Sequence, residues 1–279
     1  MNAILIVAGK ELRDGLRNRW ALAITAVFVL LAMGLAYFGP AVSGTVGFAS
    51  LATTIVSLAS LAVFLIPLIA LLLAYDSVVG EQELGTLTLL LTYPLGRFQL
   101  LAGKFLGHGA ILALSTLAGF ATAGALIGFF THQLGDAQLW LAFGFFILSA
   151  TLLGWVFVAF AYLISVSVRQ KSSAAGLALI VWFFFVLIFD LVLLGVLVAT
   201  RGAVGAAWRG AFPYLLLLNP TDVFRVANLV GFEATRVHAG LMAVAVGREL
   251  HPAPLMLVLL LWVVIPFALA VWRFQRREA

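Results

Sequence analysis

Long apolar runs separated by short polar segments make up most of this chain. A helix needs about 17–25 residues to cross a hydrocarbon core of about 30 Å, and several of these runs have that length. Because lipid offers no hydrogen bonds, such runs adopt the one structure that satisfies its own backbone, the helix. The pattern predicts an all-α integral membrane protein of one domain over residues 1–279, with six transmembrane helices at residues 20–38, 54–75, 104–130, 138–165, 173–199 and 255–272.

Composition agrees with this class. Of the 279 residues, 64% are hydrophobic and 10% are charged, whereas soluble domains have roughly 45–50% apolar and about 25% charged residues. The net charge of +5 is spread over short clusters beside the apolar runs, as expected where cationic side chains meet a membrane surface. We therefore expect the lipid bilayer, and no nucleic acid, as the partner of these charges.

The positions of Lys and Arg predict the topology. Eleven of the sixteen fall in the N-terminal tail, the second and fourth connecting loops and the C-terminal tail. Since cytoplasmic segments carry the excess of basic residues, both termini are expected in the cytoplasm. The other five arginines fall in the outer segment 200–254, which is long enough to be translocated regardless of charge.

The N-terminal segment 4–19 is predicted to form an amphipathic interfacial helix. At helical spacing Leu5, Ala8, Leu12 and Leu16 share one face, and such a helix lies in the membrane plane with that face toward the acyl chains. The opposite, polar face carries Lys10, Arg13, Asp14 and Arg17. The helix is either a simple topogenic anchor or an elbow that transmits movement from a cytoplasmic partner.

The cytoplasmic loop 76–103 holds the second constellation. It begins with carboxylates, continues through a glycine and leucines at helical spacing, and ends at Pro94 before a basic exit at Arg97 and Lys104. An amphipathic helix that projects from a membrane domain suits a groove on another protein; the alternative is a solvated hairpin. The candidate coupling residues are Glu81, Glu83, Gly85, Thr86, Leu87 and Leu91.

The order Glu81-x-x-x-Gly85-Thr86-Leu87, followed by Pro94, Arg97 and Gly103-Lys104, resembles the coupling-hairpin signature of the ABC-2 type of ABC transporter permeases. Six spans, an N-terminal interfacial helix and a large outer segment between spans five and six fit the same family. The resemblance implies a dimer of two copies of this chain on separate cytoplasmic ATPase subunits, which hold ATP and Mg²⁺. The chain itself has no Gly-x-x-x-x-Gly-Lys-Ser/Thr phosphate loop, and we expect it to have no catalytic residues.

Longer stretches narrow the resemblance within that family to the permeases that serve maturation of the copper enzyme nitrous oxide reductase. These stretches are residues 14–20, 57–62, 70–76, 171–178 and 215–222. They imply a bacterial inner-membrane location and a periplasmic β-helical partner protein. A sulfur species, a copper-related cargo, or conformational energy without cargo remain open as the output.

The outer segment 200–254 is predicted to be the docking surface for the periplasmic partner; the alternative is a lid that seals the outer mouth. Its aromatic and Arg residues are types enriched at interface cores: Trp208, Tyr214, Phe224, Arg225 and Phe232. Within it, the apolar stretch 211–218 is expected to form a short re-entrant or interfacial helix that Asn219-Pro220-Thr221-Asp222 stops.

Three further features bear on chemistry. Four Met and four His are dispersed and there is no Cys, so we expect no copper or other metal site in this chain. Asp190, deep in span five, is either functional, or it faces the dimer seam or bonds to another helix. A self-powered secondary transporter that uses Asp190 is the rival function, although no inverted repeat supports one. The spacings Gly103-xxx-Gly107 and Gly124-xxx-Gly128 predict close helix packing.

Overall fold

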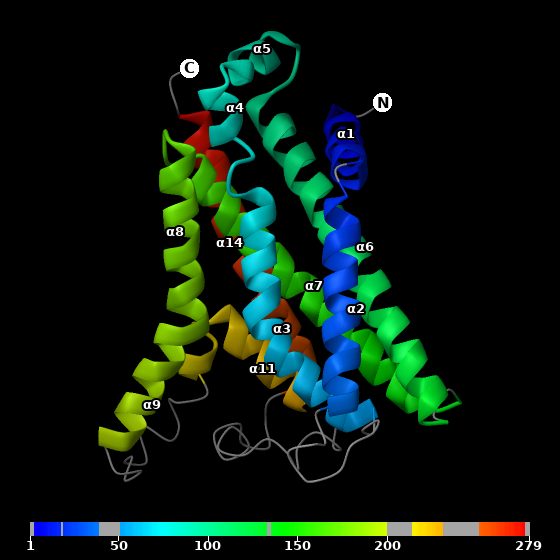
Figure 1. Ribbon diagram of the computed structural model, residues 1–279. Helices are drawn as coiled ribbons and strands as arrows, with labels where there is room; N and C mark the ends of the chain where they lie inside the picture. The colour runs from blue at the N-terminus through cyan, green and yellow to red at the C-terminus, as the bar shows by residue number, and fades with distance from the viewer. Residues whose placement is uncertain are drawn as a thin grey trace.

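The computed structural model describes residues 3–17, 19–38, 51–132, 135–199, 214–230 and 251–276, and these form an all-helical bundle (Figure 1). Five of the described helices are long and apolar enough to cross a membrane, and α1 with α2, which meet at 62°, makes a sixth as one bent pair. The long helices are α2 Trp20–Phe38, α3 Leu51–Ala74, α6 Arg97–Phe130, α7 Ala137–Ser165, α14 Pro252–Gln275, and the fifth span, made of α8 Lys171–Phe183, η2 Phe184–Ile188 and α9 Phe189–Ala199. All six predicted spans fall on these helices.

The bundle has two ends that differ in what they hold. Both termini lie at the same end, at the top of Figure 1, together with α1 (Ala3–Arg17) and the short helices α4 (Val79–Glu83) and α5 (Thr86–Thr92). We call this the termini end. The opposite end, here the far end, holds α9 and α11 (Pro220–Val230).

Helix α7 is the centre of the bundle. It packs against α3, α6, α11 and α14, and a helix that is hydrophobic all round is expected in such a buried position. Its aromatic side chains Phe143, Phe146, Phe157 and Tyr162 are fully buried. The other spans surround it and keep many apolar side chains exposed on their outer faces, which suits a lipid environment.

Two glycines of α6 let α1 approach it closely. A Cβ at Gly103 would lie 2.6 Å from the Cβ of Val7, and one at Gly107 would lie 2.5 Å from the Cβ of Glu11. Neither distance is possible between real atoms, so only glycine fits at these two positions. Farther along α6, a Cβ at Gly124 would meet the ring of Phe143 at 2.5 Å. The predicted packing role of the Gly103/Gly107 pair and of Gly124 is confirmed.

The chain before α11 stops where it was predicted to stop. Residues 211–213 lie outside the described residues, and 214–216 form a single turn that ends before Asn219. The prediction missed that Asn219-Pro220 also begins the next helix. Pro220 stands at the first helical position, where no N–H is needed, and the Asn219 side chain accepts a hydrogen bond from the Thr221 N–H at 3.0 Å.

The hairpin between α3 and α6 also differs from its prediction. A short helix that ends before Pro94 is present as α5, but Leu84 lies outside it, because the chain breaks into α4 and α5 at Gly85, whose φ is 71°. This left-handed conformation is open to glycine and costly for other residues. The third span begins at Arg97, so Lys104 lies inside α6 and not in a basic exit from the loop.

We predict that Gly107→Ala destabilises the protein by about 1–3 kcal/mol, since the added methyl group forces α1 away from α6. The matched control is Gly144→Ala on α7, where a Cβ meets nothing within 4 Å and helix propensity alone favours Ala by up to about 1 kcal/mol. Thermal unfolding in detergent, followed by tryptophan fluorescence, should show a lower Tm for the first variant only. Equal Tm values for both variants would contradict the close α1–α6 contact.

Candidate functional site at the termini end

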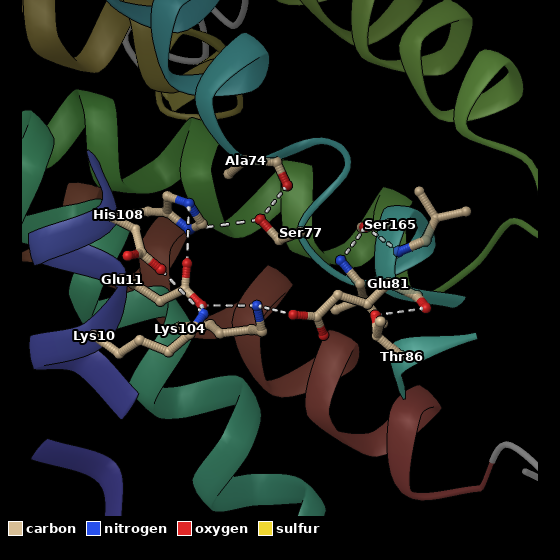
Figure 2. A network of polar contacts seen from close by, with 12 residues as sticks. Lys10, Glu11, Ala74, Ser77, Glu81, Thr86, Lys104, His108 and Ser165 are labelled. Carbon is tan, nitrogen blue, oxygen red and sulfur yellow. Dashed lines mark hydrogen bonds and ion pairs between the residues drawn. The ribbon is translucent and has the colours of Figure 1, made fainter. Parts of the chain in front are cut away.

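A buried lysine links three elements at the termini end. Lys104 on α6 is only 4% exposed, and its Nζ lies 2.9 Å from Glu11 Oε1 on α1 and 2.7 Å from Glu81 Oε1 on α4. Figure 2 shows the ammonium group between the two carboxylates. The N-terminal helix and the hairpin are therefore both fastened to the third span through one cation.

The charges make this link a strong one. A buried cation is expensive unless it is paired and hydrogen-bonded, and Lys104 has two carboxylate partners, Glu11 with 11% and Glu81 with 20% of its side chain exposed. Removing Lys104 would leave two desolvated carboxylates facing each other. Loss of one partner of such a desolvated pair costs roughly 2–5 kcal/mol.

Neutral polar groups extend the link to α7 and to the turn after α3. His108, one turn after Lys104, has its Nδ1 2.7 Å from the Tyr162 hydroxyl and 3.5 Å from Ser77 Oγ, and its Nε2 lies 3.9 Å from Glu11 Oε2. Ser77 donates to the Ala74 carbonyl at the end of α3 (Figure 2). We call this set the polar junction: Glu11, Ser77, Glu81, Lys104, His108 and Tyr162.

The base of the hairpin is held by further contacts. The Ser165 hydroxyl at the end of α7 accepts hydrogen bonds from the backbone N–H groups of Val78 and Val79, each at 3.0 Å. No side chain of its own caps α4, so Ser165 supplies the acceptor that the first turn lacks. The Lys171 side chain pairs with Asp76 at 2.6 Å, which fastens the same turn to α8.

The predicted coupling residues divide between this base and an exposed tip. Glu81 was expected to face a partner protein, but it points inward to Lys104. Glu83 is exposed, and its carboxylate accepts a hydrogen bond from the Lys171 N–H at 2.7 Å, at the start of α8. Gly85 and Thr86 are exposed at the break, where the Thr86 hydroxyl donates to the Glu81 carbonyl at 3.2 Å.

The apolar ridge predicted for the hairpin is also divided. Leu87 and Leu91 are half-buried and pack against the core. The exposed apolar side chains are instead Leu84, at 79%, and Leu89, at 64%. The left-handed Gly85 changes the chain direction between the two helices, so residues that share a face by spacing alone end on different sides.

Helix α1 presents two faces. Val7 and Glu11 face α6, whereas Leu5, Ile6 and Leu16 remain exposed, as a membrane-facing apolar side would. The polar candidates Lys10, Arg13 and Arg17 are exposed as well. Lys10 pairs with Asp14 one turn later at 3.2 Å.

A second ion cluster lies at the far end. Arg225 on α11 contacts Asp190 Oδ2 at 3.1 Å and Asp222 Oδ1 at 2.9 Å. Of the two roles left open for Asp190, the structure shows the bond to another helix. The pairing with Arg225 gives no support to a secondary transporter built on a free Asp190.

The same cluster affects the expected docking residues. Phe224 is fully buried and only 19% of the Arg225 side chain is exposed. The expectation that these two residues lie on an open docking surface is therefore wrong. Tyr214 is 70% exposed. Trp208 and Phe232 lie outside the described residues.

The polar junction itself was not foreseen. Its signal in the sequence is a lysine and a histidine four residues apart, Lys104 and His108, at the start of an otherwise apolar run. A buried lysine requires carboxylate partners, and Glu11 and Glu81 are among the few acidic residues at the termini end. Only the folded chain shows which of them approach. Among the described residues, no three His, Cys, Asp or Glu side chains are placed to hold a metal ion.

Comparison with known proteins identifies the family of this chain. The family model described as ABC-2 family transporter protein matches residues 5–279. Two curated relatives, each named "Probable ABC transporter permease protein NosY", come from Stutzerimonas stutzeri and Pseudomonas aeruginosa. They are 54% and 53% identical to this chain over 277 residues, which cover 99% of this chain and 99% of each relative. The chain therefore belongs to the ABC-2 family of transporter proteins, among its NosY-type permeases.

Proposed function

We propose that this chain is the membrane subunit that converts ATP hydrolysis by a separate NosF-type ATPase into movement across the bacterial inner membrane. Two copies of the chain form the membrane unit, and ATP and Mg²⁺ are bound by the ATPase. The output serves a NosD-type periplasmic protein and copper-site assembly of nitrous oxide reductase. The observation that carries the proposal is Lys104, which ties the hairpin and α1 to the same span.

The hairpin suits coupling because its base is fixed and its tip is open. The base is bonded to α6 through Lys104, to α7 through Ser165 and to α8 through Lys171. The tip exposes Leu84 and Leu89, which fit an apolar groove on a partner. A displacement of the tip by an ATPase would therefore move three spans together.

The orientation follows from the charges. The basic residues that favour the cytoplasmic side, among them Lys10, Arg13, Arg17 and Lys171, lie at the termini end. The proposal therefore has the hairpin in the cytoplasm beside the ATPase. The exposed Leu5 and Leu16 of α1 would then lie at the lipid surface, and α11 at the far end would lie on the side of the periplasmic partner.

We predict that Leu84→Ser with Leu89→Ser weakens binding of the ATPase subunit. Burial of a leucine contributes about 1.5–3 kcal/mol, so loss of both should lower the affinity at least about a hundredfold. The control is Thr88→Ser on α5, next to Leu89, which keeps the hydroxyl that donates to the Gly85 carbonyl. The measurement is titration of the ATPase onto the permease in lipid nanodiscs. Unchanged affinity in the double variant would exclude the tip as the contact.

A second prediction separates the base of the hairpin from its tip. Lys104→Met should leave ATPase binding intact but lower stability by about 2–5 kcal/mol, because Glu11 and Glu81 lose their cation. Adding Glu11→Gln and Glu81→Gln removes the unpaired charges and should restore most of the stability.

Maturation of nitrous oxide reductase in cells should stay defective in this stable triple variant, because the polar link is gone. Copper content of the purified reductase measures that outcome. Normal copper content in the triple variant would show that the polar junction only stabilises the fold and transmits nothing.

A further inference from the structure

The fifth span contains a π-helical turn at its middle. Between α8 and α9, residues Phe184–Ile188 form η2, and the Phe189 N–H bonds to the Phe184 carbonyl, five residues back. Such a turn is rare compared with a continuous α-helix and is frequently found at functional sites. The π-turn also leaves one backbone carbonyl without the N–H donor that a regular α-helix supplies. A carbonyl buried in a membrane then requires another donor.

Helix α11 supplies that donor. The Phe185 carbonyl accepts hydrogen bonds from Asn219 Nδ2 at 2.9 Å and from the Thr221 hydroxyl at 3.1 Å. Both donors are buried and belong to the first turn of α11. The sequence Asn219-Pro220-Thr221 thus both begins α11 and satisfies the carbonyl at the bend of span five.

Arg225 holds the same span on the other side of the turn. Its guanidinium reaches Asp190, the second residue of α9, with both terminal nitrogens at 3.1 Å from Oδ2. It also bonds Asp222 on its own helix at 2.9 Å. Helix α11 therefore holds span five before the end of η2 and again just after it.

Among the described residues, the two halves of span five differ in the elements that they contact, although both expose apolar side chains. Helix α8 contacts α3, α4 and α7, and the Trp182 indole at its end donates to the Phe64 carbonyl of α3 at 2.9 Å. Within the described part of the chain, α9 makes no extensive contact beyond η2. Its apolar side chains are exposed, Leu191 at 64% and Val198 at 68%, and Figure 1 shows α9 diverging from the bundle at the far end.

We propose that η2 is a hinge in span five and that Arg225 with Asp190 is the latch that holds α9 to α11. When the latch opens, α9 swings relative to α8 and changes the width of the far end. After Arg225 leaves Asp190 it keeps Asp222 as a carboxylate partner, and the Asp190 side chain that it leaves is already 34% exposed. The hinge concerns the far end alone and does not depend on which subunit drives the movement.

Spin labels can test the hinge directly, because the chain contains no cysteine that must first be removed. One label is placed at Leu141 on α7 as the reference. The second is placed at Val198 on α9 or, as the internal control, at Ile180 on α8; all three positions are exposed. Full-length labelled chain is diluted with unlabelled chain in lipid nanodiscs, so that distances between copies do not contribute.

The variant is Asp190→Asn, which weakens the latch and leaves the Arg225–Asp222 pair in place. We expect it to shift or roughly double the width of the 141–198 distance distribution while the 141–180 distribution stays unchanged. The matched control is Asp14→Asn at the termini end, which should change neither distribution.

Two results would overturn the hinge. One is a 141–198 distribution identical in the unmodified chain and Asp190→Asn. The other is equal broadening at Val198 and Ile180, which indicates general loosening of span five. Should Asp190→Asn not fold, Thr221→Val is measured in the same way, because it removes one bond to the Phe185 carbonyl and no charge; the same outcomes decide.

Discussion

Lipid offers no hydrogen-bonding partner, so every charged side chain that this bundle buries must find its partner within the protein. The described residues meet this demand in the same way at both ends. Lys104 lies between Glu11 and Glu81, and Arg225 lies between Asp190 and Asp222. In each cluster one cation joins carboxylates from separate elements. Leaving any of these charged groups without its partner costs free energy, and this cost holds α1, the hairpin and α11 against the spans.

Helix α7 connects the two clusters through its packing. At the termini end its Tyr162 and Ser165 belong to or support the polar junction. At the far end its Ser149 accepts a hydrogen bond from Asn228 of α11 at 2.9 Å, and Phe146 contacts the Phe224 ring. Helix α7 is thus a close-packed element that contacts both clusters or their neighbours.

Glycine residues allow both the close packing of α1 on α6 and the sharp turn within the hairpin. Gly103 and Gly107 bring α1 near enough for Glu11 to reach Lys104, so the ion pair depends on the absence of two side chains. Gly85, with its positive φ, separates the fixed base of the hairpin from its exposed tip. The π-turn in span five lies between α8, which contacts α3, α4 and α7, and α9, which is bonded to α11 through Asp190 and Arg225.

The apolar runs alone determined the helical class and the positions of the spans, because their length and the lack of lipid hydrogen bonds leave no other structure. The hairpin motif likewise pointed to the transporter family. Spacing alone wrongly joined Leu84 to the helix that follows Gly85, and it did not show that Pro220, after a stop, also begins a helix. Only the tertiary structure decided that Glu81 turns inward and that Arg225 meets Asp190. Such pairs join residues far apart in the chain, and their partners are chosen by packing, which periodicity does not encode.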